Sequence, residues 1–148
     1  MKAAWAKVET WMQFPAVRWG GLAVLGAAGA GLVLYATIGG PGIGGDATIY
    51  ITSARNLLAG VGLGLVGPQG EFRLLPYFPP FFSLVLSFLG LFTANLEGAA
   101  RWLNAVLMGG LVVLAGLMTA RATRSTLYAW LAAGLTLASP VLMPAAVW

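Results

Sequence analysis

The sequence contains no cysteine and no histidine among its 148 residues. Without cysteine the chain has no disulfide and no thiolate nucleophile, and without either residue it lacks zinc sites of the Cys/His kind. The side chain that most often shuttles protons near neutral pH is also missing. Any acid–base chemistry must therefore depend on Asp46, Glu71, Glu97 or a tyrosine.

Charged residues are scarce as well. They make up 8% of the chain, against about 25% in an average soluble domain. Hydrophobic residues make up 59%, and the mean hydropathy is +0.87. This composition indicates an integral membrane protein. The net charge of +4 comes from basic residues scattered singly, without a basic stripe. We therefore expect membrane lipid and not nucleic acid as a partner, and we interpret the basic residues as topology signals.

Long uncharged stretches predict three transmembrane helices, at residues 19–38, 99–120 (uncharged from Trp102 to Ala120, after Arg101) and 127–148. Each is long enough to cross a hydrocarbon core of about 30 Å. A cleaved secretory signal peptide is the alternative for the first stretch, but its apolar core would be about 7 to 15 residues long. We therefore expect an uncleaved signal anchor that follows a basic tail.

A fourth uncharged stretch, residues 74–96, is interrupted by prolines. Pro76, Pro79 and Pro80 disfavour helix before them, so a helix is expected only at about residues 80–93. Such a short segment is more often interfacial than spanning. If it does not cross, Arg121 and Arg124 fall on the same side as the basic amino-terminal tail, as the positive-inside rule expects.

The expected fold is therefore an all-α integral membrane protein with three transmembrane helices and two juxtamembrane helices in its first external loop. We expect it in the plasma membrane with the amino terminus in the cytoplasm. In chain order the parts are a cytoplasmic tail (1–18), the first transmembrane helix (19–38), an external loop (39–98) with interfacial helices at about 46–59 and 80–93, the second transmembrane helix (99–120), a cytoplasmic turn (121–126) and the third transmembrane helix (127–148).

The external loop holds most of the chemically useful side chains. Asp46 is a good N-cap and Gly60 a good stop signal, so residues 46–59 are predicted to form an amphipathic helix that lies flat in the headgroup layer. The glycines between Gly60 and Gly70 predict a flexible connector. Small residues four apart, Gly26 with Ala30 and Ala105 with Gly109, are interpreted as ordinary helix packing.

The order of residues in this loop resembles a known family. The residues that carry the resemblance are Gly45-Asp46, Tyr50, Ala54-Arg55-Asn56-Leu57, the Gly60/Gly62/Gly64 turn, Tyr77-Phe78-Pro79-Pro80-Phe81-Phe82 and Ala99-Ala100-Arg101-Trp102-Leu103-Asn104. This pattern is similar to the start of GT-C type polyprenyl-phosphate-dependent membrane glycosyltransferases, the group that includes protein O-mannosyltransferases. It extends over about residues 15 to 148.

The resemblance implies transfer of a sugar from a polyprenyl-phosphate donor to an acceptor on the external face. Asp46 falls where the family carries an acidic residue, which could take the acceptor's proton or hold a divalent cation. Glu71 is a candidate second metal ligand. Arg73 and Arg101 are candidates for binding the donor phosphate. Tyr77 and Asn104 complete the set as candidates for hydrogen bonds to substrate.

Each of these roles has a structural alternative. Asp46 could serve only as an N-cap, Arg73 could pair with Glu71, and Arg101 could be an interface anchor. Tyr77 and Asn104 could belong to an aromatic belt and to helix–helix contacts.

The sequence is shorter than enzymes of this family and ends inside an apolar run. We therefore expect a fragment that is inactive alone. The alternative is a complete small three-span membrane protein that acts as a scaffold or subunit without catalysis.

Overall fold

The computed structural model describes residues 14–40, 44–74 and 77–139. The chain is mostly helical, and five helices lie within these residues. They are α2 (Pro15–Ala36), α3 (Gly45–Leu58), α4 (Pro80–Gly90), α5 (Leu96–Thr123) and α6 (Thr126–Leu137). The chain divides into two compact units. We call residues 37–103 the loop unit and the rest, described at 14–36 and 104–139, the helical unit.

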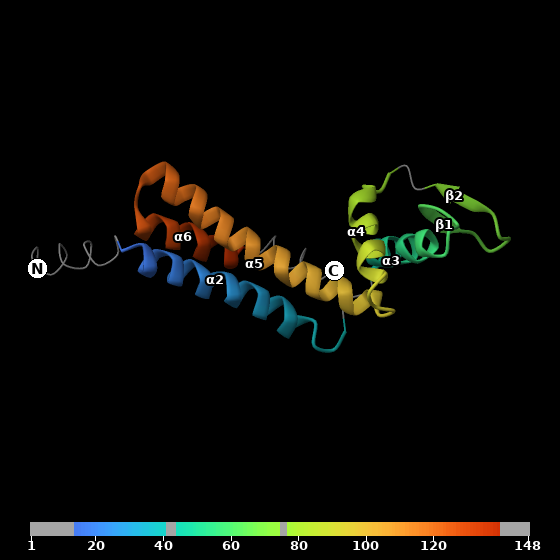
Figure 1. The fold of residues 1–148 in the computed structure, drawn as a ribbon, viewed down its shortest axis with the longest axis horizontal. Coiled ribbons are helices and arrows are strands. Elements are labelled where there is room, and N and C mark those ends of the chain that lie inside the picture. Colours follow the sequence, from blue (N-terminus) through green and yellow to red (C-terminus); the bar gives the residue numbers. More distant parts are fainter. Residues whose placement is uncertain (1–13, 41–43, 75–76, 140–148) are drawn as a thin grey trace, which may run out of the picture. The chain divides into compact units, whose positions relative to one another are not determined.

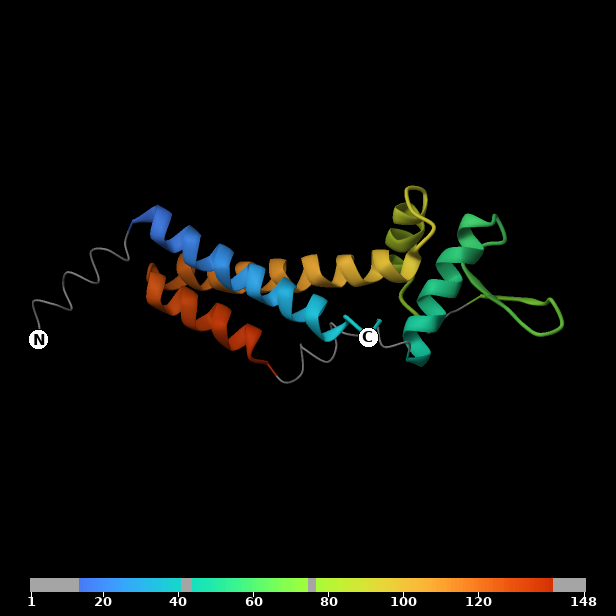
Figure 2. The ribbon, with the colours of Figure 1, turned by 90° about the horizontal axis from the view of Figure 1, so that it is seen from below.

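The helical unit consists of α2, most of α5 and α6, which run side by side (Figures 1 and 2). Its core contains Leu22 and Val33 from α2, Met108 and Val112 from α5, and Ala133 from α6. The predicted small-residue motifs meet here. A Cβ on Gly109 would lie 2.8 Å from the carbonyl oxygen of Gly26, so these two helices approach at their backbones.

Two helices, α2 and α5, are long and apolar enough to cross a membrane. At about 1.5 Å per residue, the 28 residues of α5 extend roughly 42 Å, beyond a hydrocarbon core of about 30 Å. Only 22% of the most apolar window of α2 and 33% of that of α5 is buried. The core helix of a soluble protein would be mostly buried, so the exposed apolar surface is compatible with a membrane protein.

A third transmembrane helix is not confirmed. The expected helix at 127–148 corresponds to α6, which has 12 residues and ends at Leu137 with Ala138 as its C-cap. Pro140 follows closely, and a proline disfavours helical backbone in the residue before it. Residues 140–148 lie outside the described residues, as does most of the expected cytoplasmic tail.

The loop unit is built around α3 and α4, which pack against each other (Figure 1). Ile51 and Ala54 of α3 pack with Leu86 of α4 and with Leu96 and Ala100 from the first turns of α5. The expected helices at 46–59 and 80–93 correspond to α3 and α4, although α4 ends three residues earlier than expected.

The connector between these helices is not the flexible stretch expected from its glycines. It forms an antiparallel hairpin of β1 (Gly64–Val66) and β2 (Phe72–Leu74), with Leu65 opposite Arg73. The turn is closed by the N–H of Gly70, which donates to the carbonyl oxygen of Gly67 at 3.0 Å. The expected all-α fold is therefore wrong at this two-stranded hairpin, although the rest of the described chain has no other strand. The hairpin was missed in the sequence because its strands are only three residues long and lie in a connector rich in glycine.

Candidate functional site

Asp46 lies in the first turn of α3, at the amino end of an amphipathic helix. It is not the N-cap, because Gly44 has the extended backbone of that position and no side chain caps the helix. Instead, a carboxylate in the first turn lies at the positive end of the helix dipole. The Asp46 side chain is exposed, and no described residue forms an ion pair or hydrogen bond with it.

One turn further along α3, Tyr50 belongs to an aromatic cluster. The Tyr50 ring meets the rings of Phe78 and Phe82 edge-on, with centroids 5.6 and 5.5 Å apart. Ser83 Oγ also donates to the carbonyl oxygen of Tyr50 at 3.1 Å. Two segments that carry the family resemblance, one on α3 and one at the Pro79-Pro80 turn, are therefore in contact. Tyr77, just before this cluster, is 93% exposed.

Glu71 and Arg73 form an ion pair within the hairpin. Their side-chain atoms lie 2.9 Å apart, and the second carboxylate oxygen of Glu71 accepts the backbone N–H of Gln69 at 3.1 Å. The Arg73 side chain is largely exposed, so water screens the pair and its net stabilisation is about 1 kcal/mol or less. The pairing considered as an alternative in the sequence is thus present. Phosphate binding by Arg73 stays a prediction.

Arg101, in the part of α5 that belongs to the loop unit, is bonded to Thr37, the residue after α2. Its Nε donates to Thr37 Oγ1 at 2.9 Å, and Thr37 is only 2% exposed. Arg101 is half-buried and takes part in further interactions, so it is not a freely solvated interface anchor. Asn104 is also half-buried and engaged, but it belongs to the helical unit.

The predicted metal ligands do not form a metal site within the described residues. No group of three or more acidic side chains that could hold a metal ion occurs there. Glu71 is already engaged by Arg73 and by the hairpin backbone. The divalent cation and the metal-binding roles of Asp46 and Glu71 therefore stay predictions.

Sequence reasoning missed an ion pair that ties α3 to α5. Arg55, in the last turn of α3, pairs with Glu97, in the first turn of α5. Each charge sits at the helix end where the helix dipole favours it. The position of each charge at a helix end could have been recognised in the sequence. The pairing itself joins residues 42 positions apart and depends on tertiary structure.

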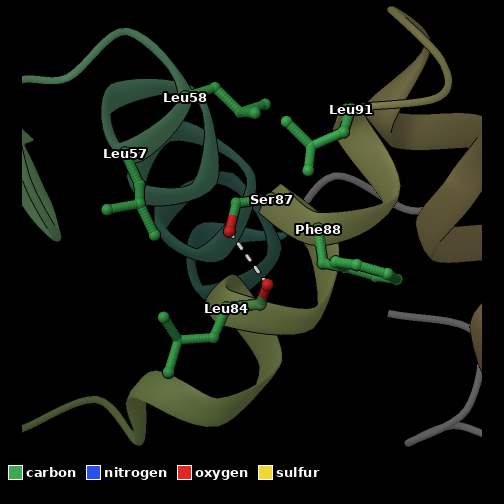
Figure 3. A pocket seen from close by; sticks show the side chains of 6 residues that line it. All are labelled: Leu57, Leu58, Leu84, Ser87, Phe88 and Leu91. Atoms are coloured by element: carbon green, nitrogen blue, oxygen red, sulfur yellow. Dashed lines mark hydrogen bonds between the residues drawn. The ribbon is translucent and has the colours of Figure 1, made fainter.

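Apolar side chains of α3 and α4 line an open hollow of about 280 Å³ (Figure 3). Leu57 and Leu58 come from α3, whereas Leu84, Phe88 and Leu91 come from α4 and its C-cap. Ser87 also lines it, but its Oγ donates to the carbonyl oxygen of Leu84 at 2.9 Å. The hydroxyl proton is thus satisfied within α4, and the hollow presents a mainly hydrocarbon surface.

Comparison with models of protein families, with curated proteins and with solved structures gives no match to this chain.

Proposed function

We propose that this chain forms part of a membrane glycosyltransferase that moves a sugar from a polyprenyl-phosphate donor to an acceptor on the external face. The observation that carries the proposal is the exposed carboxylate of Asp46, in the first turn of an amphipathic helix and without a partner among the described residues. That helix follows an apolar helix of membrane length, so the carboxylate would lie beside the bilayer surface. There it can accept the proton of an attacking hydroxyl.

The proposed topology has three membrane crossings in the plasma membrane, with the amino terminus in the cytoplasm. The first two are α2 and α5, and the third begins with α6. The loop unit then faces outward. The apolar hollow between α3 and α4 supports this placement, because a lipid chain of the donor could lie against it.

The other predicted residues take supporting roles in this proposal. Arg73 would exchange its exposed ion pair with Glu71 for the donor phosphate, which it can bind bidentately. Arg101 and Asn104 are already engaged, so their role would be to position neighbouring groups. Tyr77 is exposed enough to donate its hydroxyl to a sugar or phosphate oxygen.

The decisive experiment is a transfer assay in proteoliposomes, using the complete product of the gene and labelled polyprenyl-phosphate sugars. Asp46→Asn keeps the size of the side chain and removes the base, so turnover should fall by about 100-fold or more. Glu97→Gln removes a carboxylate that already has Arg55 as a partner, and it should keep most of the turnover. Turnover in Asp46→Asn equal to that in Glu97→Gln would rule out the catalytic role.

A second candidate function is a three-span membrane scaffold or subunit without catalysis. It is favoured by the two ion pairs, Arg55 with Glu97 and Arg73 with Glu71, because four charged residues of the loop unit then have structural partners. Donor binding separates the two proposals. A transferase should bind the lipid-linked donor more weakly after Arg73→Gln, whereas a scaffold should bind neither that donor nor its phosphate.

A further inference from the structure

Three arginines line one cavity at an end of the helical unit. The cavity has a volume of about 340 Å³ and is lined by Arg18, Trp19, Leu117, Ala120, Arg121 and Arg124. Arg18 lies near the amino end of α2, Arg121 in the last turn of α5, and Arg124 in the turn before α6. Residues far apart in the sequence thus place their positive charges around the same hollow.

These positive charges have no acidic partner within the described part of the helical unit. Arg18, Arg121 and Arg124 are the only charged residues among positions 14–36 and 104–139. Like charges around one cavity repel one another, more strongly where the surroundings are apolar. An anion in the cavity would remove this repulsion and would be held by several guanidinium groups at once.

Arg18 provides a second, independent observation. Its Nε is buried and has no hydrogen-bond partner in the described structure. A buried donor without an acceptor costs roughly 1 to 3 kcal/mol, so such groups usually have an acceptor that is part of the working molecule. The carbonyl oxygen of Arg18 accepts a long hydrogen bond from Trp130 Nε1 at 3.4 Å, which links α2 to α6. An anionic oxygen bound in the cavity could supply the missing acceptor.

We propose that this cavity binds the phosphodiester headgroup of an anionic phospholipid from the surrounding bilayer. Its position favours a lipid over a free anion. The cavity lies where α2 begins and α5 ends, and these are the two helices of membrane length. Trp19 at its edge is half-exposed, as interfacial tryptophans are. Elsewhere on α5, Leu114 and Met118 expose apolar surface that acyl chains could cover.

Basic pockets between membrane helices are a recurrent way of holding anionic headgroups. The proposal depends on the membrane placement of α2 and α5 but not on transferase chemistry, since Asp46 and Arg73 belong to the other unit.

The test measures which lipids the whole chain retains. The protein is reconstituted in vesicles of equal parts phosphatidylglycerol and phosphatidylcholine, extracted in mild detergent, and its bound lipids are quantified by mass spectrometry. The wild-type chain should retain phosphatidylglycerol in clear excess. Arg121→Gln with Arg124→Gln should reduce that excess by about fivefold for each arginine removed.

The control is Arg55→Gln, which removes one positive charge from the loop unit and should leave the excess intact. Arg121→Lys with Arg124→Lys keeps the positive charges and should retain most of it, which separates charge loss from misfolding. High salt should weaken the preference of the wild-type chain without any substitution.

Three results would overturn the proposal. The first is equal retention of both lipids by the wild-type chain. The second is a loss of preference in Arg55→Gln as large as the loss for each arginine removed from the cavity. The third is displacement of the lipid by excess inorganic phosphate, which would assign the cavity to a free anion. Flotation of the reconstituted vesicles separates two failures. If the chain does not float with the vesicles, the membrane placement is overturned as well. If the chain floats but shows no lipid preference, only this proposal is overturned.

Discussion

Gly26 and Gly109 illustrate how much depends on single residues in this chain. At these two residues the backbones of α2 and α5 are in contact, and the missing side chains permit this approach. Gly110, the next residue on α5, has open space where a Cβ would be. In the sequence, Gly109 and Gly110 are neighbours in the same predicted helix. Only the four-residue spacing between Ala105 and Gly109 distinguishes Gly109 from Gly110.

We expect Gly109→Ala to destabilise the helical unit by about 1 to 3 kcal/mol, because its Cβ would lie 2.8 Å from a backbone oxygen that cannot easily move. Gly110→Ala is the matched control and should be neutral or slightly stabilising. Unfolding in detergent followed by circular dichroism measures both. Equal stability of the two variants would mean that the close approach of α2 and α5 is not rigid.

At the scale of elements, the chain uses different signals to begin and end each helix. α2 begins at Pro15, since proline suits the first helical position. α5 begins after Asn95, whose Oδ1 accepts the N–H of Gly98 at 2.8 Å as an N-cap does. These signals are local and can be identified in the sequence. The hairpin between α3 and α4 differs, because its register depends on the pairing of two very short strands.

The hairpin turn requires Gly70, whose φ of +83° is costly for other residues. Since a Cβ there would meet nothing within 4 Å, Gly70→Ala tests backbone conformation alone. We expect a cost of roughly 1 kcal/mol and about fivefold faster hydrogen exchange at the N–H of Gly67, which donates to Glu71 across the turn.

Gly45→Ala is the control for this substitution. Gly45 also has open space around its Cβ position, but it lies in the first turn of α3 with an ordinary φ. Exchange at Gly67 should stay unchanged in this variant. If the N–H of Gly67 exchanges at the same rate in Gly70→Ala as in Gly45→Ala, the turn tolerates a side chain at position 70.

At the scale of the whole molecule, the central question is the side of the membrane on which each unit is exposed. Arg18, Arg121 and Arg124 line one cavity, so the start of α2 and the end of α5 would face the same compartment if both helices cross a membrane. The proposed topology assigns that compartment to the cytoplasm, as positive charge near membrane helices favours. The loop unit should then be external.

Cysteine labelling can test this topology without background, since the chain has no cysteine of its own. Ala59 and Ala122 are both exposed alanines, one after α3 and one in the last turn of α5. In intact cells, an impermeant maleimide should label Ala59→Cys at once and Ala122→Cys only after the membrane is permeabilised. Labelling of both from the same side would contradict the proposed topology and the external site of Asp46.

Only part of the candidate site follows from local sequence. The position of Asp46 at the start of a helix was predicted to within two residues, and the pairing of Glu71 with Arg73 was a foreseeable alternative because the two are close in sequence. The bond between Arg101 and Thr37 joins residues 64 positions apart. No local sequence signal specifies Thr37 as the partner of Arg101, so this hydrogen bond could not be predicted.

Local sequence signals predicted where most of the helices form, because proline, glycine, capping residues and the length of apolar runs act over a few residues. The composition also indicated a membrane environment, since 8% charged residues is far below the share in an average soluble domain. Tertiary structure decided which charges meet. It paired Arg55 with Glu97, and it gathered three scattered arginines around one cavity, because helix packing brings together side chains that the chain keeps far apart.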